Sequence, residues 1–346
     1  MTGRARPWRR LALNTLLVLT SAAIALALVD LVLILTNTPA HGPVWEARGL
    51  FRLDSELIYA PVPGERRVWR TEEFAEQASI NRHGLRGAEL RERSEIEARI
   101  IVTGDSVVFG HGVGDREAFP SRLEAIFASG GRDLEVLNAG VKGYGTDQSF
   151  KHFTLRLQAL RPDVLVFAVN PNDVADNIRQ PLYTVKDGRL LELDATRNPF
   201  YRVLWLDSHL PGIVRHTDLY QRLVTRLLRA HWDRTLPDSD PQRLNAWSRE
   251  KIVLEIEQLR DRSRSAGFRL VVLGVPSTAP DAFRWLRSSL PDDVDFLDAN
   301  EVETWANEPS RWFLNDRTHL TAAGNQRLAH LLHRHLLDTE NPVAAP

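Results

Sequence analysis

The chain has 346 residues, of which 43% are hydrophobic and 26% charged, so it can bury at least one large core and is not expected to be disordered. Its formal net charge is -1, from 44 basic and 45 acidic residues, which argues against a nucleic-acid-binding protein. The chain contains no cysteine, so disulfides, thiolate metal sites and thiol catalysis are excluded.

The N-terminus has the pattern of a membrane segment. Residues 1–10 carry four arginines and no acidic residue, and residues 11–36 are almost wholly apolar. As a helix, the uncharged run 11–29 would span roughly 28 Å, about the thickness of the hydrocarbon core of a bilayer. We therefore expect a single-pass signal anchor over 11–36 in the inner (cytoplasmic) membrane. The arginines predict a cytoplasmic N-terminus and a periplasmic or extracellular remainder. Asp30 is expected at the far interface, with pairing to a partner helix within the span as the alternative.

A cleaved signal peptide is the alternative for this segment. The apolar region of such peptides is about 7–15 residues long, and this run is longer. Thr38-Pro39-Ala40 would also be a poor cleavage site because of its proline. The retained anchor is therefore the favoured interpretation.

A change of pattern near residue 98 separates two further parts. Residues 37–98 are mixed and rich in proline, which predicts a juxtamembrane linker with a small β-rich lead-in. Beyond them, five aliphatic runs lack polar alternation and are separated by helical patterns near 119–128, 147–160, 280–290 and 320–338. The runs are residues 99–103, 134–137, 163–169, 268–275 and 294–297. Such runs are typical of a parallel sheet covered on both faces. We predict an α/β domain over 99–340 with a five-stranded parallel sheet between helices.

Residues 176–250 interrupt the alternation and form a predicted cap-like insertion. They contain a turn signal, Lys186-Asp187-Gly188, and several aromatic residues. Six apolar residues fall on one helical face, with arginines elsewhere around the helix: Leu219, Leu223, Val224, Leu227, Leu228 and Trp232. Packing of this helix on the sheet domain is favoured, and contact with lipid is the alternative.

The residues that directly follow the predicted strands carry candidate chemistry, because ligands of open α/β sheets bind beyond the carboxyl ends of the strands. Gly104-Asp105-Ser106 follows the first run, so Ser106 is expected in a tight turn at the sheet edge. By itself this pattern is weak, and a serine that caps a helix would also explain it. His111, five residues later, is expected to be a solvated loop residue, with lining of the pocket mouth as the alternative.

Two further residues follow the second and third runs. Gly140 has no side chain, so its N–H can approach a bound oxygen closely. The Asn172 carboxamide can donate a second hydrogen bond to the same oxygen. With the N–H of Ser106 they would form a three-donor oxyanion hole, although each alone could be an ordinary turn residue.

An acid and an imidazole precede the last predicted helix, in Asp316-Arg317-Thr318-His319. Three residues apart on one loop, both can point inward, so that Asp316 holds one ring nitrogen of His319 and the other nitrogen faces Ser106. This arrangement would be a catalytic triad whose acid and base come from one loop.

Together these motifs resemble the SGNH hydrolases, also called the GDSL esterase and lipase superfamily, in a membrane-anchored bacterial form. The resemblance covers about residues 99–175 and 268–338. The four blocks that carry it are Gly104-Asp105-Ser106, Asn138-Ala139-Gly140, Asn170-Pro171-Asn172-Asp173 and Asp316-Arg317-Thr318-His319. Val107 and Asn170 depart from the family pattern, which usually has leucine and glycine there, and these departures bear on substrate preference.

The resemblance implies a three-layer, flavodoxin-like fold and a division of roles among the motif residues. Ser106 would be the nucleophile, His319 the general base and then acid, and Asp316 its orienting partner. Ser106, Gly140 and Asn172 would be the oxyanion donors. No metal or organic cofactor is expected.

The expected activity is that of a serine esterase that cleaves carboxylic esters, acetyl esters among them, through an acyl-enzyme. The substrate would be an ester-bearing small molecule or an acylated glycan. One alternative is an O-acyltransferase or deacetylase that acts on envelope or exported polysaccharide. The other is a non-catalytic scaffold that retains the fold.

Overall fold

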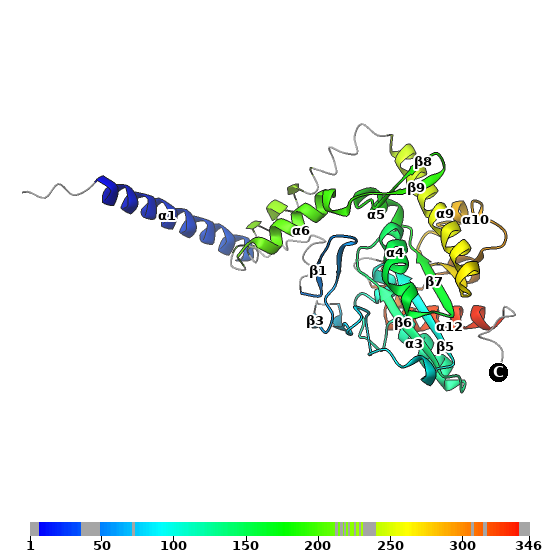
Figure 1. The fold of residues 1–346 in the computed structure, drawn as a ribbon. Helices are drawn as coiled ribbons and strands as arrows, with labels where there is room; N and C mark the ends of the chain where they lie inside the picture. The colour runs from blue at the N-terminus through cyan, green and yellow to red at the C-terminus, as the bar shows by residue number, and fades with distance from the viewer. Residues whose placement is uncertain are drawn as a thin grey trace, which may run out of the picture.

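A computed structural model describes residues 7–35, 49–70, 73–211, 240–305, 308–313 and 317–338, together with individual residues between 214 and 230. Its centre is a five-stranded parallel sheet in the order β11-β10-β7-β5-β6 (Figure 1). The strands are β5 (Ala98–Gly104), β6 (Leu134–Gly140), β7 (Val164–Val169), β10 (Arg269–Gly274) and β11 (Asp295–Asp298). The predicted α/β fold with a five-stranded parallel sheet is therefore confirmed.

The order of the strands indicates where on the sheet a ligand would bind. The chain enters the sheet at β5, adds β6 on one side and then continues with β7 on the other side. The direction of winding therefore reverses at β5, and ligands of such sheets bind at this reversal, beyond the carboxyl ends of the strands.

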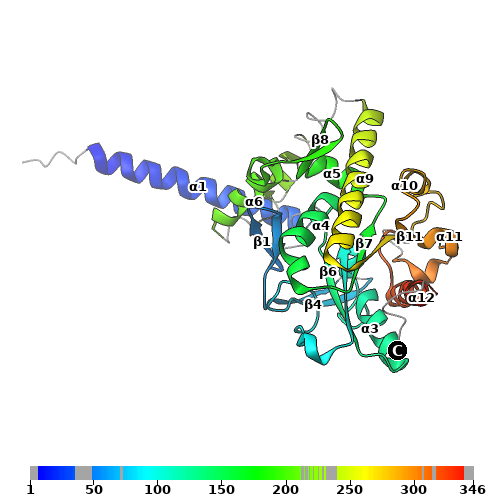
Figure 2. The same cartoon turned by 45° about the vertical axis from the view of Figure 1, so that its right-hand side comes forward.

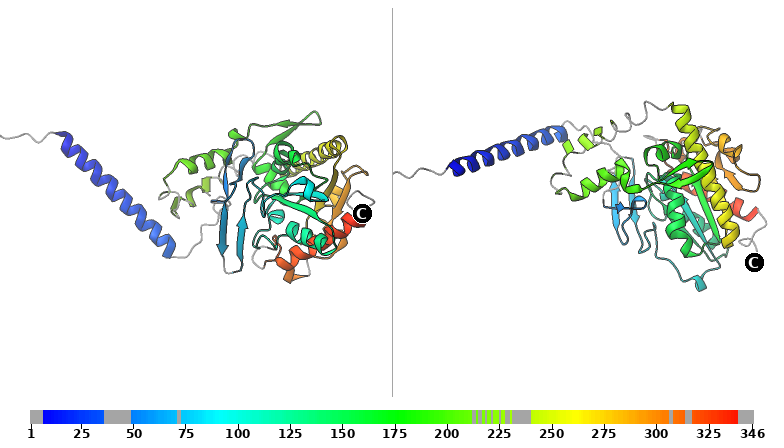
Figure 3. Two further views of the ribbon diagram at one scale, coloured as in Figure 1. Left: turned by 60° about the horizontal axis from the view of Figure 1, so that its bottom comes forward. Right: turned by 45° about the horizontal axis from the view of Figure 1, so that its top comes forward.

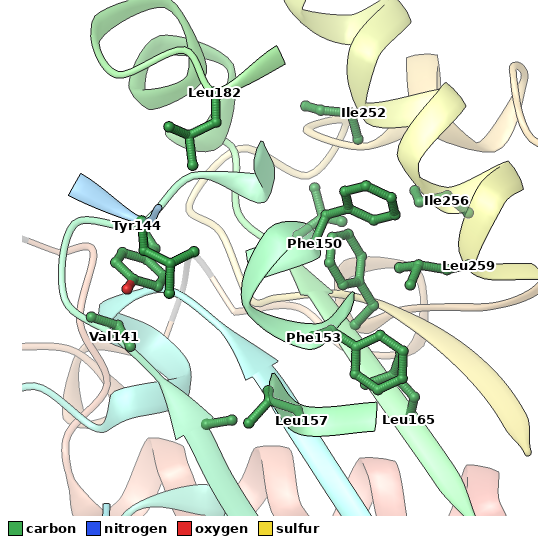
Figure 4. Packing of buried hydrophobic residues seen from close by; sticks show 14 of the residues in the cluster. Val141, Tyr144, Phe150, Phe153, Leu157, Leu165, Leu182, Ile252, Ile256 and Leu259 are labelled. Atoms are coloured by element: carbon green, nitrogen blue, oxygen red, sulfur yellow. The ribbon is translucent and has the colours of Figure 1, made fainter. Parts of the chain in front are cut away.

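Helices cover both faces of the sheet (Figure 2). One face is covered by α4 (Thr146–His152), α5 (Asp173–Arg179) and α9 (Pro241–Ala266), and the other by α3 (Phe119–Ser129) and α12 (Ala322–Asp338). Successive strand residues alternate between the two cores, which explains why the strands read as continuous apolar runs. In Figure 4, Phe150 and Phe153 lie between the sheet and the apolar face of α9, and Leu157 lies against the sheet.

Two predicted helices differ from the observed ones. The helix expected over 147–160 is α only as far as His152 and continues as a π-helical segment, Phe153–Leu157, and a 3-10 turn, Gln158–Leu160. The helix expected near 280–290 is a single turn, α10 (Arg284–Arg287). The remaining short helices are α2 (Ser106–Phe109), α11 (Ala299–Val302) and the 3-10 turns Arg93–Glu95, Ala195–Arg197 and Pro309–Arg311.

The N-terminal apolar segment forms one helix, α1 (Pro7–Leu35), which projects away from the α/β domain (Figure 1). Its part Trp8–Val32 is long and apolar enough to cross a membrane, as an anchor or as a signal sequence. Near its end, the Asp30 carboxylate accepts a hydrogen bond of 3.1 Å from the N–H of Leu219.

Two β-hairpins precede the sheet and lie beside it (Figure 3). They are β1 (Phe51–Asp54) with β2 (Ile58–Pro61), and β3 (Arg66–Arg70) with β4 (Ala75–Ser79). Leu57, Ile58 and Leu85 are buried in the same core as α4 and α9. The lead-in therefore packs on the α/β domain over much of its length.

The predicted insertion begins within α5 and contains a third hairpin, β8 (Tyr183–Lys186) with β9 (Arg189–Glu192). Its turn residues, Asp187 and Gly188, both have positive φ, as a two-residue hairpin loop requires. The helix α6 (Pro199–His209) follows. The helix α9 begins at Pro241, inside the predicted range of the insertion. Of the predicted helical face, Leu228 and Trp232 lie outside the described residues.

Candidate active site

Ser106 lies at the first position of a strand–turn–helix junction. The strand β5 ends at Gly104, Asp105 caps α2, and Ser106 is the first residue of that helix. The cap is a hydrogen bond of 2.9 Å from the N–H of Val107 to Asp105 Oδ1. This junction holds the Ser106 hydroxyl at the edge of the sheet where the winding reverses.

The His319 side chain meets Ser106 across 213 residues of sequence. Its Nε2 lies 2.8 Å from Ser106 Oγ, a distance at which the imidazole can take the hydroxyl proton. Backbone hydrogen bonds hold the loop of His319, including one of 3.1 Å from the N–H of Phe313 to the His319 carbonyl. The predicted Asp316 lies outside the described residues.

Asn172 follows β7 and is the N-cap residue directly before α5. Its Nδ2 donates a hydrogen bond of 2.9 Å to Asp176 Oδ2, one turn along the helix. Its Oδ1 is buried and has no hydrogen-bond partner among the described residues. Burial raises the pKa of the Asp105 carboxyl, and the Asn172 amide is close enough to oppose that rise, so it lies beside the turn that carries Ser106.

Gly140 lies within β6, opposite Gly104 of β5. Its N–H donates a hydrogen bond of 3.0 Å to Asn138 Oδ1, so this bond would have to break before Gly140 could bind an oxyanion. A Cβ at Gly140 would lie 2.3 Å from the backbone nitrogen of Phe109, which gives a packing reason for glycine at this position.

Gly143, which the sequence analysis did not single out, lies three residues farther along. It has φ +76 in a turn that is closed by a hydrogen bond of 3.1 Å from the N–H of Tyr144 to the Val141 carbonyl. The N–H of Gly143 is not part of that bond, and the residue is exposed beyond the end of β6. Gly143 is thus a second candidate for a backbone donor at this edge.

Three buried carboxyl groups, those of Asp105, Asp173 and Asp176, lie near Ser106, and burial raises the pKa of each. The pKa of Asp176 is raised to about 7, and that of Asp173 well above its usual value. Burial also raises the pKa of Asp105, although a backbone hydrogen bond, the His319 charge and two amides oppose this. Asn170 links the group, because its Nδ2 donates to Asp105 at 2.9 Å and its N–H donates to Asp173 at 2.7 Å.

The expectation that His111 is a solvated loop residue is wrong. The residue is 6% exposed, and its ring lies against that of His319 with 4.3 Å between the centroids. Glu76 of β4 lies 3.7 Å from His111 Nδ1 and accepts a 2.8 Å hydrogen bond from Lys142 Nζ. The lead-in therefore covers His111 and forms part of the surroundings of the site. This contact joins residues far apart in sequence, so no local pattern could have predicted it.

Within the described part of the chain, no three His, Cys, Asp or Glu side chains are arranged to hold a metal ion. The groups gathered around Ser106 are a hydroxyl, two imidazoles, carboxamides and buried carboxyls. A nucleophile with its base, together with nearby hydrogen-bond donors, is the set that acyl transfer uses.

Comparison with solved structures gives several proteins that are similar to this chain. A lipolytic protein of the G-D-S-L family from Desulfitobacterium hafniense has 12% sequence identity and a TM-score of 0.40, over 69% of this chain and 99% of that one. A psychrotrophic esterase from Pseudoalteromonas sp. has 10% identity and a TM-score of 0.40, over 69% and 96%. A family 3 carbohydrate esterase from Clostridium thermocellum has 14% identity and a TM-score of 0.39, over 70% and 96%.

Comparison with curated protein sequences gives no match. The model of the GDSL-like lipase/acylhydrolase family, in contrast, matches residues 102–327, which is more than half of the chain. The matched range begins within β5 and ends within α12, so it contains both Ser106 and His319. This chain belongs to the GDSL-like lipase/acylhydrolase family of ester-hydrolysing enzymes.

Proposed function

We propose that this enzyme is a membrane-anchored serine esterase with Ser106 as nucleophile, His319 as general base and Asp316 as the acid that orients the imidazole. The observation that carries the proposal is the distance of 2.8 Å between His319 Nε2 and Ser106 Oγ. A serine hydroxyl is a weak nucleophile by itself, and a neighbouring imidazole that accepts its proton activates it.

The reaction would proceed in two displacements. Ser106 Oγ adds to the ester carbonyl while His319 takes its proton, and the tetrahedral intermediate then expels the alcohol, which receives that proton from His319. Water, activated by the same imidazole, then adds to the acyl-enzyme and releases the acid and free Ser106.

The oxyanion would be held by the N–H of Ser106 and by Asn172 Nδ2. The N–H of Ser106 is at the first position of α2, where a helix provides no acceptor of its own. The third donor would be a backbone N–H after β6. Gly140 can serve if its bond to Asn138 opens, whereas the N–H of Gly143 lies outside the hydrogen bond that closes its turn.

We propose carboxylic esters as substrates, including acetyl esters on a small molecule or on a glycan. The second candidate is an O-acyltransferase or deacetylase of envelope polysaccharide. A transferase would pass the acyl group from the same acyl-enzyme to a sugar hydroxyl in place of water, whereas a deacetylase would take the acyl group from the glycan and release it to water. The apolar helix α1 supports this second candidate, because an anchor would hold the enzyme close to envelope glycans. In both cases α1 would be the retained anchor in the inner membrane, with the N-terminus inside and the α/β domain in the periplasm or outside the cell.

Hydrolysis assays with the purified full chain test the proposal. Release of acid from 4-nitrophenyl esters of increasing acyl length should be measured beside Ser106→Ala and His319→Ala variants. We expect turnover that both substitutions abolish. Turnover that survives in Ser106→Ala would contradict the proposed nucleophile. Analysis of the products in the presence of an oligosaccharide acceptor separates hydrolysis from transfer.

A further inference from the structure

The helix α6 has an exposed face with mixed apolar and basic character. Arg202, Trp205, Leu206 and His209 occupy positions that share one side of the helix, and all four are exposed. The opposite side packs on the core through Phe200, which is buried. The orientation of α6 is thus fixed by its inner side, and its outer side presents tryptophan and leucine to the surroundings.

Helical residues after α6 also expose apolar side chains. Leu223 and Leu227 are four residues apart and exposed, whereas Val224 between them is buried. Arg226 is exposed beside the two leucines. We call the exposed apolar residues of the two segments the α6 patch. Its members are Trp205, Leu206, Val214, Leu223 and Leu227, of which each exposes between 40% and 58% of its surface.

The end of α1 lies next to the α6 patch. The hydrogen bond from the N–H of Leu219 to Asp30 joins the two segments directly. Asp30 is two residues before the end of the apolar stretch Trp8–Val32. Figure 1 and the right view of Figure 3 both place α6 and the helical residues that follow it beside the end of α1.

We propose that the α6 patch rests in the headgroup region of the bilayer that α1 crosses, so that the α/β domain docks on the lipid surface. This inference goes beyond the esterase activity, and it rests on the proposed membrane anchor. Helices that lie in the interface carry tryptophan and leucine on one side with basic residues beside them, as α6 does. Arg202 and Arg226 suit the phosphate groups of anionic lipids.

The position of the patch favours lipid over a protein partner. A membrane-spanning α1 ends at the interface, where Asp30 is expected, and the bond to Leu219 brings the patch to that level. Exposed apolar side chains on a water-soluble surface are unfavourable, and the lipid that covers α1 would cover these side chains as well.

Docking would also fix the active site relative to the membrane. The Phe200 ring on the inner side of α6 lies edge-on to Tyr59, with 6.0 Å between the centroids. The Tyr59 hydroxyl donates a 2.8 Å hydrogen bond to the Lys142 carbonyl, in the turn that contains Gly143. A short chain of contacts therefore connects the α6 patch to the edge of the sheet that carries the site.

Fluorescence of single-cysteine variants tests this proposal, because the chain has no cysteine of its own. The full chain, with Leu206→Cys or Leu223→Cys labelled by an environment-sensitive dye, would be reconstituted in vesicles of equal parts phosphatidylcholine and phosphatidylglycerol. Leu31→Cys in α1 is the reference for membrane insertion, and Ser265→Cys at the far end of α9 is the solvent reference. We expect blue-shifted emission at 206 and 223, quenched about twofold or more by nitroxide-labelled lipids, as at 31 and unlike 265.

Each other outcome contradicts docking. Quenching at 31 but not at 206 and 223 would overturn docking and leave the anchor intact. A blue shift at 206 and 223 without lipid quenching would mean that protein, such as a second copy of the chain, covers the patch. The absence of quenching at all positions would overturn both the anchor and docking. Hydrolysis of a soluble ester by the same labelled proteins shows that they are folded and tests the esterase proposal separately.

Discussion

Asn172 and Ser106 come from different strand ends, and their proximity makes the amide a candidate for stabilising the negative charge that develops on the substrate oxygen. Removal of a single oxyanion donor typically lowers kcat by about 10²–10³. We therefore expect Asn172→Ala to lower kcat by that factor with little change in KM. Asn198→Ala, which removes an amide that caps α6, is the matched control and should leave kcat unchanged. Full turnover of Asn172→Ala would exclude the assigned role.

Asp176 holds the Asn172 amide, and its buried carboxyl gives a prediction about pH. Burial raises its pKa to about 7 in the folded protein, from 3.8 in the unfolded chain. The groups that face it are Asp105 and Tyr59 from other elements, and Asp173 and Arg179 on its own helix. Because the folded state binds the proton more tightly, stability is lost as the pH rises from about 4 to about 7.

The variant Asp176→Asn cannot ionise, so it escapes this loss. Relative to the unsubstituted protein, it should gain on the order of 2 kcal/mol of unfolding free energy between about pH 5 and pH 8. Thermal or urea unfolding of both proteins at the two pH values measures this gain. A stability difference that is the same at both pH values would show that Asp176 does not titrate in this range.

For single residues, the sequence identifies the reactive side chains of the candidate site more readily than the contacts that those side chains make. Ser106 and His319 could be singled out because each lies in a short motif at a predicted strand or helix end, and the structure brings them together. The hydrogen bond that the Gly140 N–H donates to Asn138 Oδ1 depends on backbone geometry inside β6. The burial of His111 depends on the lead-in, so neither feature could be read from local pattern.

Arg86 connects two elements, the lead-in and the segment after Ser106. Its buried guanidinium donates to Asp115 Oδ1 at 2.9 Å and to the carbonyls of Phe109, Gly110, Val113 and Gln77. Removal of one partner from such a buried charged network costs about 3–5 kcal/mol. We expect Arg86→Met to lower the unfolding free energy by that amount. Arg82→Met is the matched control, because the Arg82–Glu89 pair is exposed and should contribute about 0–1 kcal/mol. Equal effects of the two substitutions in urea unfolding would contradict this role of Arg86.

The local sequence pattern predicts the strands of the central sheet, but it does not predict the π-helical stretch or the packing of the lead-in hairpins. The five apolar runs predict the strands because both faces of the sheet are buried. The π-helical stretch Phe153–Leu157 continues an apolar face without a sequence break, so periodicity alone does not reveal it. The packing of the two lead-in hairpins on the domain depends on contacts between distant residues, such as Glu76 with Lys142.

The arrangement of the whole molecule depends on the direction in which α1 crosses the membrane. The four arginines among residues 1–10 predict a cytoplasmic N-terminus. Alkaline phosphatase, which is active only after export, should therefore be active when it is fused to the C-terminus of the chain. The same enzyme should be inactive when it is fused to the N-terminus. The reverse pattern would place the α/β domain in the cytoplasm and exclude envelope glycans as substrates.

The central claim is that His319 activates Ser106 for attack on an ester carbonyl. Labelling of the purified full chain with a fluorophosphonate probe, followed by mass spectrometry of its peptides, tests this claim most directly. We expect a covalent adduct on Ser106 that is absent in Ser106→Ala and strongly reduced in His319→Ala. A folded protein that never reacts, or that reacts equally well without His319, would contradict the claim and favour a scaffold that retains the fold.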